Sequence, residues 1–165
     1  MEFTKKQIAR YSRQIVLKKI SVIGQKKILE SNILIVGAGG LGSPIALYLA
    51  AMGVGKIGIV DKDKVEISNL SRQIIFSSND IGKSKSLTAI KKIKKINPDI
   101  KVISFNEKLT NENIKKIGKK FKFIIDGSDN FRTRFLINDY CLKNKKVLIS
   151  GAISKFDGQV YTFNF

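Results

Sequence analysis

Short apolar runs and stretches with helical spacing alternate along this chain. An unbroken run such as Ile33–Val36 is typical of a strand buried on both faces of a parallel sheet. The pattern predicts strands over 33–36, 56–60, 101–106, 121–126, 147–150 and 159–165. Helical spacing between them predicts helices over 44–52, 83–96, 111–117 and from about 130 to 144. This alternation indicates a Rossmann-like, doubly wound α/β fold with a mostly parallel sheet.

Residues 1–31 have a helical pattern of their own. Thr4 and Gln7 have the spacing of a capping box, which predicts a helix from Thr4 to about Leu17. Gly24-Gln25 is expected to break the chain before a second short helix that ends near Glu30. We therefore predict one domain over 1–165, with N-terminal helices over 1–31 and a Rossmann-like core over 32–165.

A glycine loop follows the first buried strand. Gly37, Gly39 and Gly42 have G-x-G-x-x-G spacing, in which the glycines allow a tight turn, a close approach to phosphate and close helix packing. Pro44 suits the first turn of the next helix, whose N–H groups point at an anion. Asp61 ends the next strand, 19 residues after Gly42, where an acid usually meets ribose hydroxyls. Together these features predict a nucleotide-binding domain.

The uncharged stretch 33–55 has two other interpretations: it could be a glycine turn that binds no ligand, or it could span a membrane. Six glycines and Pro44 interrupt the stretch. Its helix of about eleven residues is too short to cross a bilayer, so we expect no membrane partner. The N-terminus does not have the pattern of a signal peptide, and a single cysteine excludes an internal disulfide. A cytoplasmic location is the natural expectation.

The amino-acid composition limits which catalytic groups and partners are possible. The chain has no histidine, which removes His-based acid–base catalysis and His-ligated zinc. The net charge of +18 would fit a nucleic-acid partner, but between 80 and 122 the thirteen lysines and four acids suggest solvated helix faces. We therefore expect nucleic acid to be an unlikely partner and favour an acidic protein as the use of the charge.

Arginine is scarce, with five residues against 26 lysines, and it is favoured where a planar fork must grip phosphate or carboxylate. The arginines are Arg10, Arg13, Arg72, Arg132 and Arg134. Arg132 and Arg134 are predicted to be helix-surface charges. Cys141 is predicted to be a small core residue and not a nucleophile.

Four stretches together resemble the ThiF/MoeB/HesA family, relatives of ubiquitin-activating enzymes. They are Arg10–Gln14, Gly37–Gly42, Asp61 with Ser68–Gln73, and Asp129-Asn130. Gly82–Lys85 and Ile96–Pro98 also fit, so the resemblance extends over essentially the whole chain. It implies an adenylyltransferase that uses ATP to activate the C-terminal glycine of a ubiquitin-like sulfur-carrier protein with a Gly-Gly tail. Pyrophosphate is released, and the product serves sulfur transfer in thiamin or molybdenum cofactor synthesis.

The resemblance also implies roles for single residues. Asp61 would hold the ribose, and Asp129 would hold Mg²⁺. The implied nucleotide-binding set is Gly37, Gly39, Gly40, Gly42, Asp61, Ser68, Asn69, Arg72, Lys85, Asp129 and Asn130. The implied catalytic set is Arg13, Arg72, Lys85 and Asp129, with Arg13 reaching the neighbouring subunit's site in a homodimer.

Alternatives remain open at this point. Asp61 could cap a strand end, Lys85 could be a surface lysine, and Asp129 could be the N-cap of the following helix. The glycine loop and Asp61 would suit an NAD-dependent oxidoreductase equally well. A tRNA-modifying dehydratase of the same superfamily and a non-catalytic scaffold are further readings.

The chain departs from the family pattern at its end, because it stops at Phe165. Longer members continue into a segment with two zinc-binding Cys-x-x-Cys pairs and a loop that clamps the carrier's tail. We therefore expect no family zinc site in these 165 residues, and only weak carrier-dependent activity from them alone.

Overall fold

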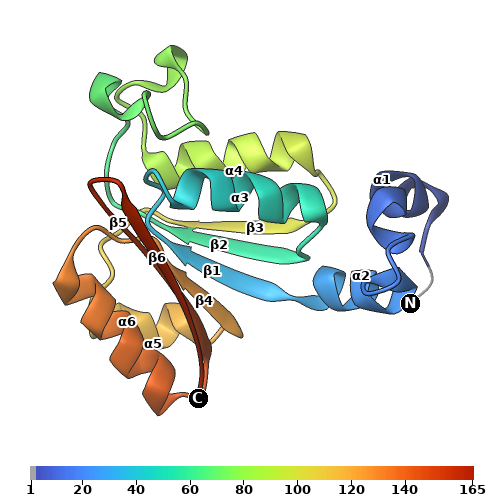
Figure 1. Cartoon of the computed structure of the whole chain (residues 1–165). Helices are drawn as coiled ribbons and strands as arrows, with labels where there is room; N and C mark the ends of the chain where they lie inside the picture. The colour runs from blue at the N-terminus through green and yellow to red at the C-terminus, as the bar shows by residue number, and fades with distance from the viewer. Residues whose placement is uncertain (1–2) are drawn as a thin grey trace.

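The computed structural model describes residues 3–165 as six helices against a six-stranded sheet (Figure 1). The strands are β1 (Asn32–Val36), β2 (Lys56–Val60), β3 (Lys101–Phe105), β4 (Phe123–Asp126), β5 (Val147–Ser154) and β6 (Asp157–Asn164). The helices are α1 (Lys5–Ile15), α2 (Ser21–Glu30), α3 (Gly42–Met52), α4 (Lys85–Ile96), α5 (Asn113–Gly118) and α6 (Phe131–Lys143). Every strand and helix predicted from the sequence is present, with bounds that differ by a few residues.

The sheet has the order β3-β2-β1-β4-β5-β6. The pairs from β3 to β5 are parallel, and only β6 runs antiparallel, against β5. This is the strand order of a Rossmann fold, in which the chain reverses direction across the sheet between β1 and β4. The predicted doubly wound, mostly parallel α/β fold is therefore confirmed. Ligands of such sheets bind outside the carboxyl ends of the strands at this reversal.

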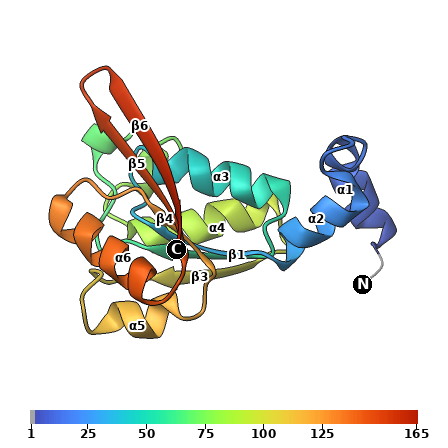
Figure 2. The ribbon, with the colours of Figure 1, turned by 60° about the horizontal axis from the view of Figure 1, so that its bottom comes forward.

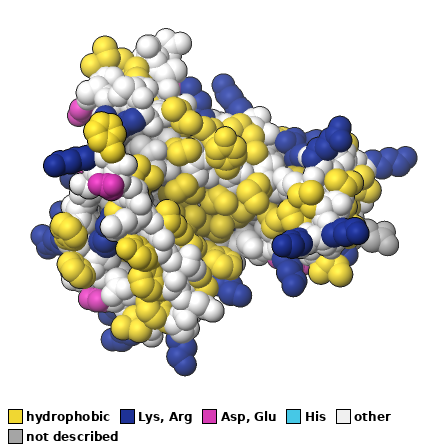
Figure 3. Space-filling view, viewed as in Figure 1, with side chains coloured by type: hydrophobic (Ala, Val, Ile, Leu, Met, Phe, Trp, Pro, Cys, Tyr) yellow, Lys and Arg dark blue, Asp and Glu magenta, His cyan; other side chains and the backbone are white. Residues whose placement is uncertain are grey.

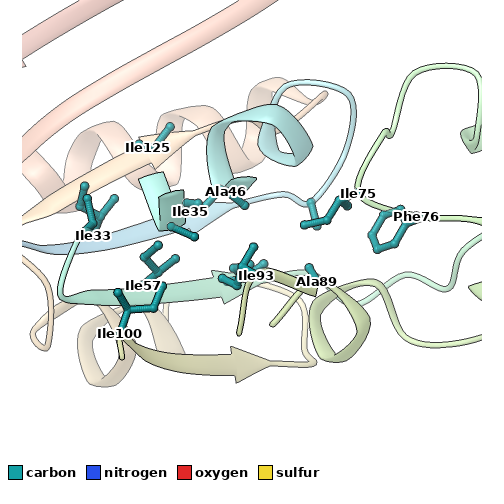
Figure 4. Packing of buried hydrophobic residues seen from close by; sticks show 14 of the residues in the cluster. Ile33, Ile35, Ala46, Ile57, Ile75, Phe76, Ala89, Ile93, Ile100 and Ile125 are labelled. Carbon is teal, nitrogen blue, oxygen red and sulfur yellow. The ribbon is translucent and has the colours of Figure 1, made fainter. Parts of the chain in front are cut away.

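Alternate residues of each strand face two separate cores. Ile33 and Ile35 of β1 pack with α3 and α4, whereas Leu34 and Val36 pack with α5 and α6. Figure 4 shows the first core, with Ile35 and Ile57 of the sheet together with Ala46 of α3 and Ile93 of α4. The strands are apolar throughout because both faces are covered. Each fully buried isoleucine contributes about 1.5–3 kcal/mol.

The N-terminal helices differ from the prediction in where the chain breaks between them. The capping box of Thr4 and Gln7 is confirmed at the start of α1. However, α2 runs through Gly24 and Gln25, and the break comes earlier, where Ser21 has a φ of 55°. A glycine inside a helix costs only about 1 kcal/mol. Gln25 is fully buried, and its Nε2 fixes α2 to the end of α3 by donating to Met52 O at 2.9 Å.

Two sequence stretches that had no predicted role meet where α1 docks on the core. Tyr11 is fully buried, and Asn97 Nδ2 donates to its hydroxyl at 2.9 Å. Arg10 Nη1 donates to Ile96 O at 2.9 Å. Gly53 ends α3 at a φ of 87°, and any side chain there would meet the Tyr11 ring. Arg10 and Tyr11 thus attach α1 to the C-terminal ends of α3 and α4.

The last two strands form a long hairpin that projects beyond the sheet (Figure 2). β5 continues to Ser154, four residues past its predicted end at Ser150, because β6 pairs with it along its whole length. All of β6 is exposed. Within residues 3–165, no helix is both long enough and apolar enough to cross a membrane.

Candidate functional site

A cleft of about 770 Å³ opens at the carboxyl ends of the strands, where β1 and β4 lie side by side. Its walls come from the glycine loop, the segments after β2, β3 and β4, the start of α4 and the end of β5. Eight of the predicted site residues line it: Gly37, Gly39, Gly40, Asp61, Arg72, Lys85, Asp129 and Asn130. These residues come from segments up to 93 positions apart, and the sheet order brings them to one edge.

The glycine loop is a tight turn that leaves no room for a side chain at Gly37 or Gly42. Gly37 has a φ of 91°, which glycine adopts without strain. At Gly42, a Cβ atom would lie 1.9 Å from the Gly37 carbonyl oxygen. The loop therefore presses the start of α3 against the end of β1. Leu41, directly before α3, lines the cleft, so the helix begins at the edge of the sheet where an anion would bind.

Asp61 is held by two backbone donors. Its Oδ2 accepts from Ala38 N and its Oδ1 accepts from Asp63 N, both at 2.8 Å. Burial raises the pKa of the Asp61 carboxyl above its usual value, although these two N–H donors and nearby Lys85 act in the opposite direction. Asp61 thus links the glycine loop to the loop after β2. Each of its oxygens keeps a lone pair that could accept a ligand hydroxyl.

Two of the cations that line the cleft, Lys85 and Arg72, are predicted site residues. Lys85 is the first residue of α4 and is buried, and its Nζ lies 3.9 Å from Asp63 Oδ2. The surface-lysine alternative for Lys85 is therefore excluded. Arg72 passes beside Gly40 with its side-chain carbons, and its Nη1 donates to Ser68 O at 3.0 Å. Two cations thus border the glycine loop, an arrangement suited to a polyphosphate.

The segment after β4 resolves the question of the helix cap. Asn130, not Asp129, is the N-cap of α6, and its Oδ1 accepts from Thr133 N at 2.9 Å. Asp129 is exposed at the cleft, and its Oδ1 accepts only a 3.3 Å bond from Asn130 Nδ2. The capping alternative for Asp129 is therefore wrong. Its carboxylate is available to a ligand or a cation.

Sequence reasoning missed a buried ion pair beneath this segment. Asp126 is 1 % exposed, and its oxygens accept from Ser128 N, Ser128 Oγ and Ser150 Oγ at 3.0, 2.6 and 2.9 Å. Arg134 Nε lies 3.2 Å from Asp126 Oδ2. Its Nη2 donates to Ser128 O at 3.2 Å and to Gly151 O at 3.1 Å. Arg134 is thus a structural clamp and lines the cleft, which corrects its prediction as a surface charge.

Two signals could have identified this clamp. Arg134 is one of five arginines in a lysine-rich chain, and Asp126 stands at the carboxyl end of a buried strand. The Ser128 peptide is held on both sides, by Asp126 at its N–H and by Arg134 at its carbonyl. Asp129 follows directly, so the clamp sets where its carboxylate stands.

We expect Arg134→Lys to loosen this segment. Lysine keeps the charge but cannot donate from a rigid fork to both carbonyls. Amide hydrogen exchange at Ser128 should accelerate at least about tenfold, and urea unfolding should show a loss of about 1–2 kcal/mol. Arg132→Lys, on an exposed side chain of the same helix, is the matched control and should change both by little. Unchanged exchange at Ser128 in Arg134→Lys would contradict the clamp.

Four predicted site residues lie outside the cleft wall. Gly42 is buried behind the loop, and Asn69 is buried with its Oδ1 accepting from Glu66 N. Ser68 is exposed on the short 3₁₀ helix Ile67–Asn69. Arg13 is exposed on α1, which lies at the opposite end of the sheet in Figure 1. The chain therefore does not bring Arg13 to its own cleft.

The described residues offer neither an activated thiol nor a ready-made metal cage. Cys141 is fully buried, and burial raises the pKa of its thiol to about 12, in line with its prediction as a core residue. Within residues 3–165, no group of three or more acidic, histidine or cysteine side chains converges on a point. Mg²⁺ does not need one, since it is commonly held by one or two carboxylates together with substrate phosphates. Asp129 fits that donor set.

Comparison with known proteins gives one family. The model of the ThiF family matches residues 11–164. The chain is 50 % identical over 163 residues to a Porphyra purpurea protein named "Probable molybdopterin-synthase adenylyltransferase", covering 99 % of this chain and 43 % of that protein. It is 42 % identical over 164 residues to the sulfur carrier protein adenylyltransferase of Thermus thermophilus, covering 99 % of this chain and 60 % of that protein. The chain thus spans about half the length of these relatives.

Solved structures share the fold. E. coli MccB with MccA-N7isoASN superposes with a TM-score of 0.87 at 25 % identity, over 94 % of this chain and 47 % of that one. The E. coli tRNA N6-threonylcarbamoyladenosine dehydratase TcdA in complex with AMP superposes with a TM-score of 0.84 at 26 % identity, over 95 % of this chain and 64 % of that one. MccB was also solved with ATP. That structure superposes with a TM-score of 0.72 at 27 % identity, over 78 % of this chain and 38 % of that one.

Proposed function

Since the chain belongs to the ThiF family, we propose that it adenylates the C-terminal carboxylate of a ubiquitin-like sulfur-carrier protein at the expense of ATP, releasing pyrophosphate. The observation that carries this proposal is the cleft itself. There the glycine loop, Asp61, Arg72, Lys85 and Asp129 line one cavity at the reversal point of the sheet. The two relatives described above are named for this kind of reaction.

The proposed reaction needs charge stabilisation more than acid–base chemistry. A carboxylate must approach an α-phosphate that is itself negative, and the leaving pyrophosphate gains charge. Arg72 and Lys85 beside the glycine loop would neutralise that charge, and the N-terminus of α3 would bind the phosphates. Asp61 would accept hydrogen bonds from the ribose. None of these steps needs histidine, which the chain lacks.

Mg²⁺ belongs to the proposal as a companion of the phosphates. When bound, it would neutralise phosphate charge and help to orient the triphosphate. Asp129 is the residue that we propose as its protein ligand, because its carboxylate is exposed at the cleft and does not cap α6. The clamp of Asp126 and Arg134 would keep that carboxylate directed at the phosphates.

A homodimer with shared sites completes the proposal. Arg13 is exposed and does not line the cleft of its own chain, so it would serve the cleft of a second copy. Large apolar side chains are exposed on α6 and the hairpin, among them Phe131, Phe135, Tyr161 and Phe163, which a second copy would cover. Figure 3 shows apolar side chains gathered across the middle of one face. A cytoplasmic location fits the free, buried Cys141.

The carrier is proposed as a class and not as one protein. The Porphyra relative is named for molybdopterin synthase and the Thermus relative for a sulfur carrier. A tRNA-modifying dehydratase is the second candidate, favoured by the similarity in fold to TcdA. The chain is 42–50 % identical to the two adenylyltransferases but only 26 % identical to TcdA, so a carrier protein is favoured over tRNA as the substrate.

We expect ATP with Mg²⁺ to stabilise residues 1–165 and NAD to leave them unchanged. A ligand at 100 times its Kd adds about 2.7 kcal/mol, which corresponds to a rise in Tm of roughly 5–10 °C for a chain of this size. Thermal unfolding with each nucleotide measures this. Arg72→Ala should lose most of the shift, whereas Arg132→Ala, outside the main cleft, should keep it. A shift with NAD alone would favour the oxidoreductase and overturn the proposal.

A further inference from the structure

Lysines begin neighbouring strands of the sheet at its amino edge, opposite the cleft. Lys56 of β2 pairs in register with Lys101 of β3 and, on its other side, with Asn32 of β1. Lys122 and Lys146 precede the paired residues Phe123 and Val147 of β4 and β5. At about 4.8 Å between strands, the row from Lys101 to Lys146 spans roughly 19 Å.

Three more lysines flank this row in the adjoining turns. We call the set the lysine edge; it consists of Lys56, Lys101, Lys119, Lys120, Lys122, Lys145 and Lys146. Two of its ammonium groups are anchored, because Lys56 Nζ donates to Lys120 O at 3.2 Å and Lys146 Nζ to Phe121 O at 2.8 Å. The lysine edge is therefore partly preorganised.

Acidic side chains gather at the other end of the sheet. Nine of the thirteen acids lie at or after the carboxyl ends of strands or beside the hairpin turn: Asp61, Asp63, Glu66, Asp80, Glu107, Glu112, Asp126, Asp129 and Asp157. Near the amino edge stand Glu30, at the end of α2, and Asp99, which is paired with Lys6. Within residues 3–165, no ion pair involves a lysine of the lysine edge. The positive charge there is uncompensated.

The composition of the lysine edge distinguishes two kinds of partner. Protein interfaces are depleted in lysine and rely on aromatic, methionine and arginine side chains. The lysine edge has no arginine, and its segments contribute no exposed large apolar side chain. Phe105, Phe121 and Phe123 lie beneath its ammonium groups, which excludes them as stacking platforms for bases. Lysines without such platforms are typical of contacts to phosphates.

We propose that the lysine edge binds the phosphate backbone of a double-helical nucleic acid without reading its sequence. The distribution of charge along the sequence had favoured an acidic protein instead, because the strand-start lysines are scattered over 90 positions and only the sheet aligns them. The surface lies at the opposite edge from the cleft of the same chain, so a bound duplex leaves that cleft open.

The experiment compares two sets of lysine changes that remove the same charge. One protein carries Lys101→Gln, Lys119→Gln, Lys122→Gln and Lys145→Gln in the lysine edge. The control carries Lys64→Gln, Lys83→Gln, Lys91→Gln and Lys155→Gln elsewhere. All eight side chains are exposed, and the one ion pair among them, Lys83 with Asp80, leaves Asp80 still paired with Lys92 at 2.7 Å, so both proteins should keep the wild-type Tm. Fluorescence anisotropy gives the Kd for DNA and RNA duplexes of about 20 base pairs between about 50 and 200 mM salt.

The lysine-edge protein should bind both duplexes roughly 10- to 100-fold more weakly, with the slope of log K against log salt reduced by about 3–4. The control should bind within about threefold of wild type. Binding of RNA alone would assign the surface to RNA. Equal losses in both proteins would reduce the effect to net charge and overturn the proposal. It is also overturned if wild type binds polyglutamate but neither duplex, which would indicate an acidic protein partner.

Discussion

Mixing Arg13→Ala with Asp129→Ala protein is expected to restore about a quarter of wild-type activity to two proteins that are each nearly inactive. Asp129 lines the cleft, whereas Arg13 is exposed on α1 at the far end of the sheet. Loss of one such charge-stabilising group typically costs about 100- to 1,000-fold in rate. An arginine supplied in trans increases the rate of phosphoryl transfer about 1,000-fold or more. Each single variant should therefore be almost silent in carrier-dependent exchange of pyrophosphate into ATP.

The mixture separates action in trans from action within one chain. After unfolding, equal mixing and refolding, half the dimers carry one copy of each variant. In such a dimer one cleft combines an intact Asp129 with the partner's intact Arg13, so one site in four recovers overall. If Arg13 serves its own cleft, no site contains both residues and mixing restores nothing. The assay is best done in a protein extended to the length of the relatives, with refolded wild type as the reference.

Gly42→Ala should be strongly destabilising. The added Cβ atom would lie 1.9 Å from the Gly37 carbonyl oxygen and 2.9 Å from its carbon. Both atoms are backbone, so no flexible side chain can move aside, and the start of α3 must shift away from β1. Overpacking of this kind costs about 3 kcal/mol or more. The shift would also open the glycine loop, so the stabilisation by ATP should fall along with the free energy of unfolding.

Gly158→Ala is the matched control for this change. A Cβ atom at Gly158 would meet nothing within 4 Å, and its φ is not positive. Urea unfolding should therefore give a free energy within about 0.5 kcal/mol of wild type. A Gly42→Ala protein with wild-type stability would show that the contact of α3 with the glycine turn is loose, contrary to the structure.

Local patterns predicted the elements well because their causes are local. An apolar run such as Ile33–Val36 reports a strand covered on both faces, and Thr4 and Gln7 report a helix start four residues long. The glycine spacing predicted the turn that begins α3 for the same reason. Where the prediction was wrong, as at Gly24-Gln25, a distant contact of Gln25 with Met52 outweighed a local preference.

The candidate site was predictable in part. The residues that line the cleft from the glycine loop, Asp61, Arg72, Lys85 and Asp129 were all singled out from the sequence. Their roles in binding nucleotide and Mg²⁺ stay predictions. Asp126 and Arg134 were missed, because a scarce arginine and an aspartate that ends a strand only suggest that each residue matters, and neither signal shows that the two pair.

The sequence by itself determined the strands and helices, the glycine turn and the residue types available for chemistry. Those features depend on neighbours within a few positions, where periodicity and capping act. Only the tertiary structure decided that Arg134 also holds Gly151 of β5, that Asp61 and Asp129 line one cleft, and that scattered lysines align along one edge. These features join segments far apart in the chain, and which segments meet is set by the strand order, because parallel strands bring their carboxyl ends to one edge and their amino ends to the other.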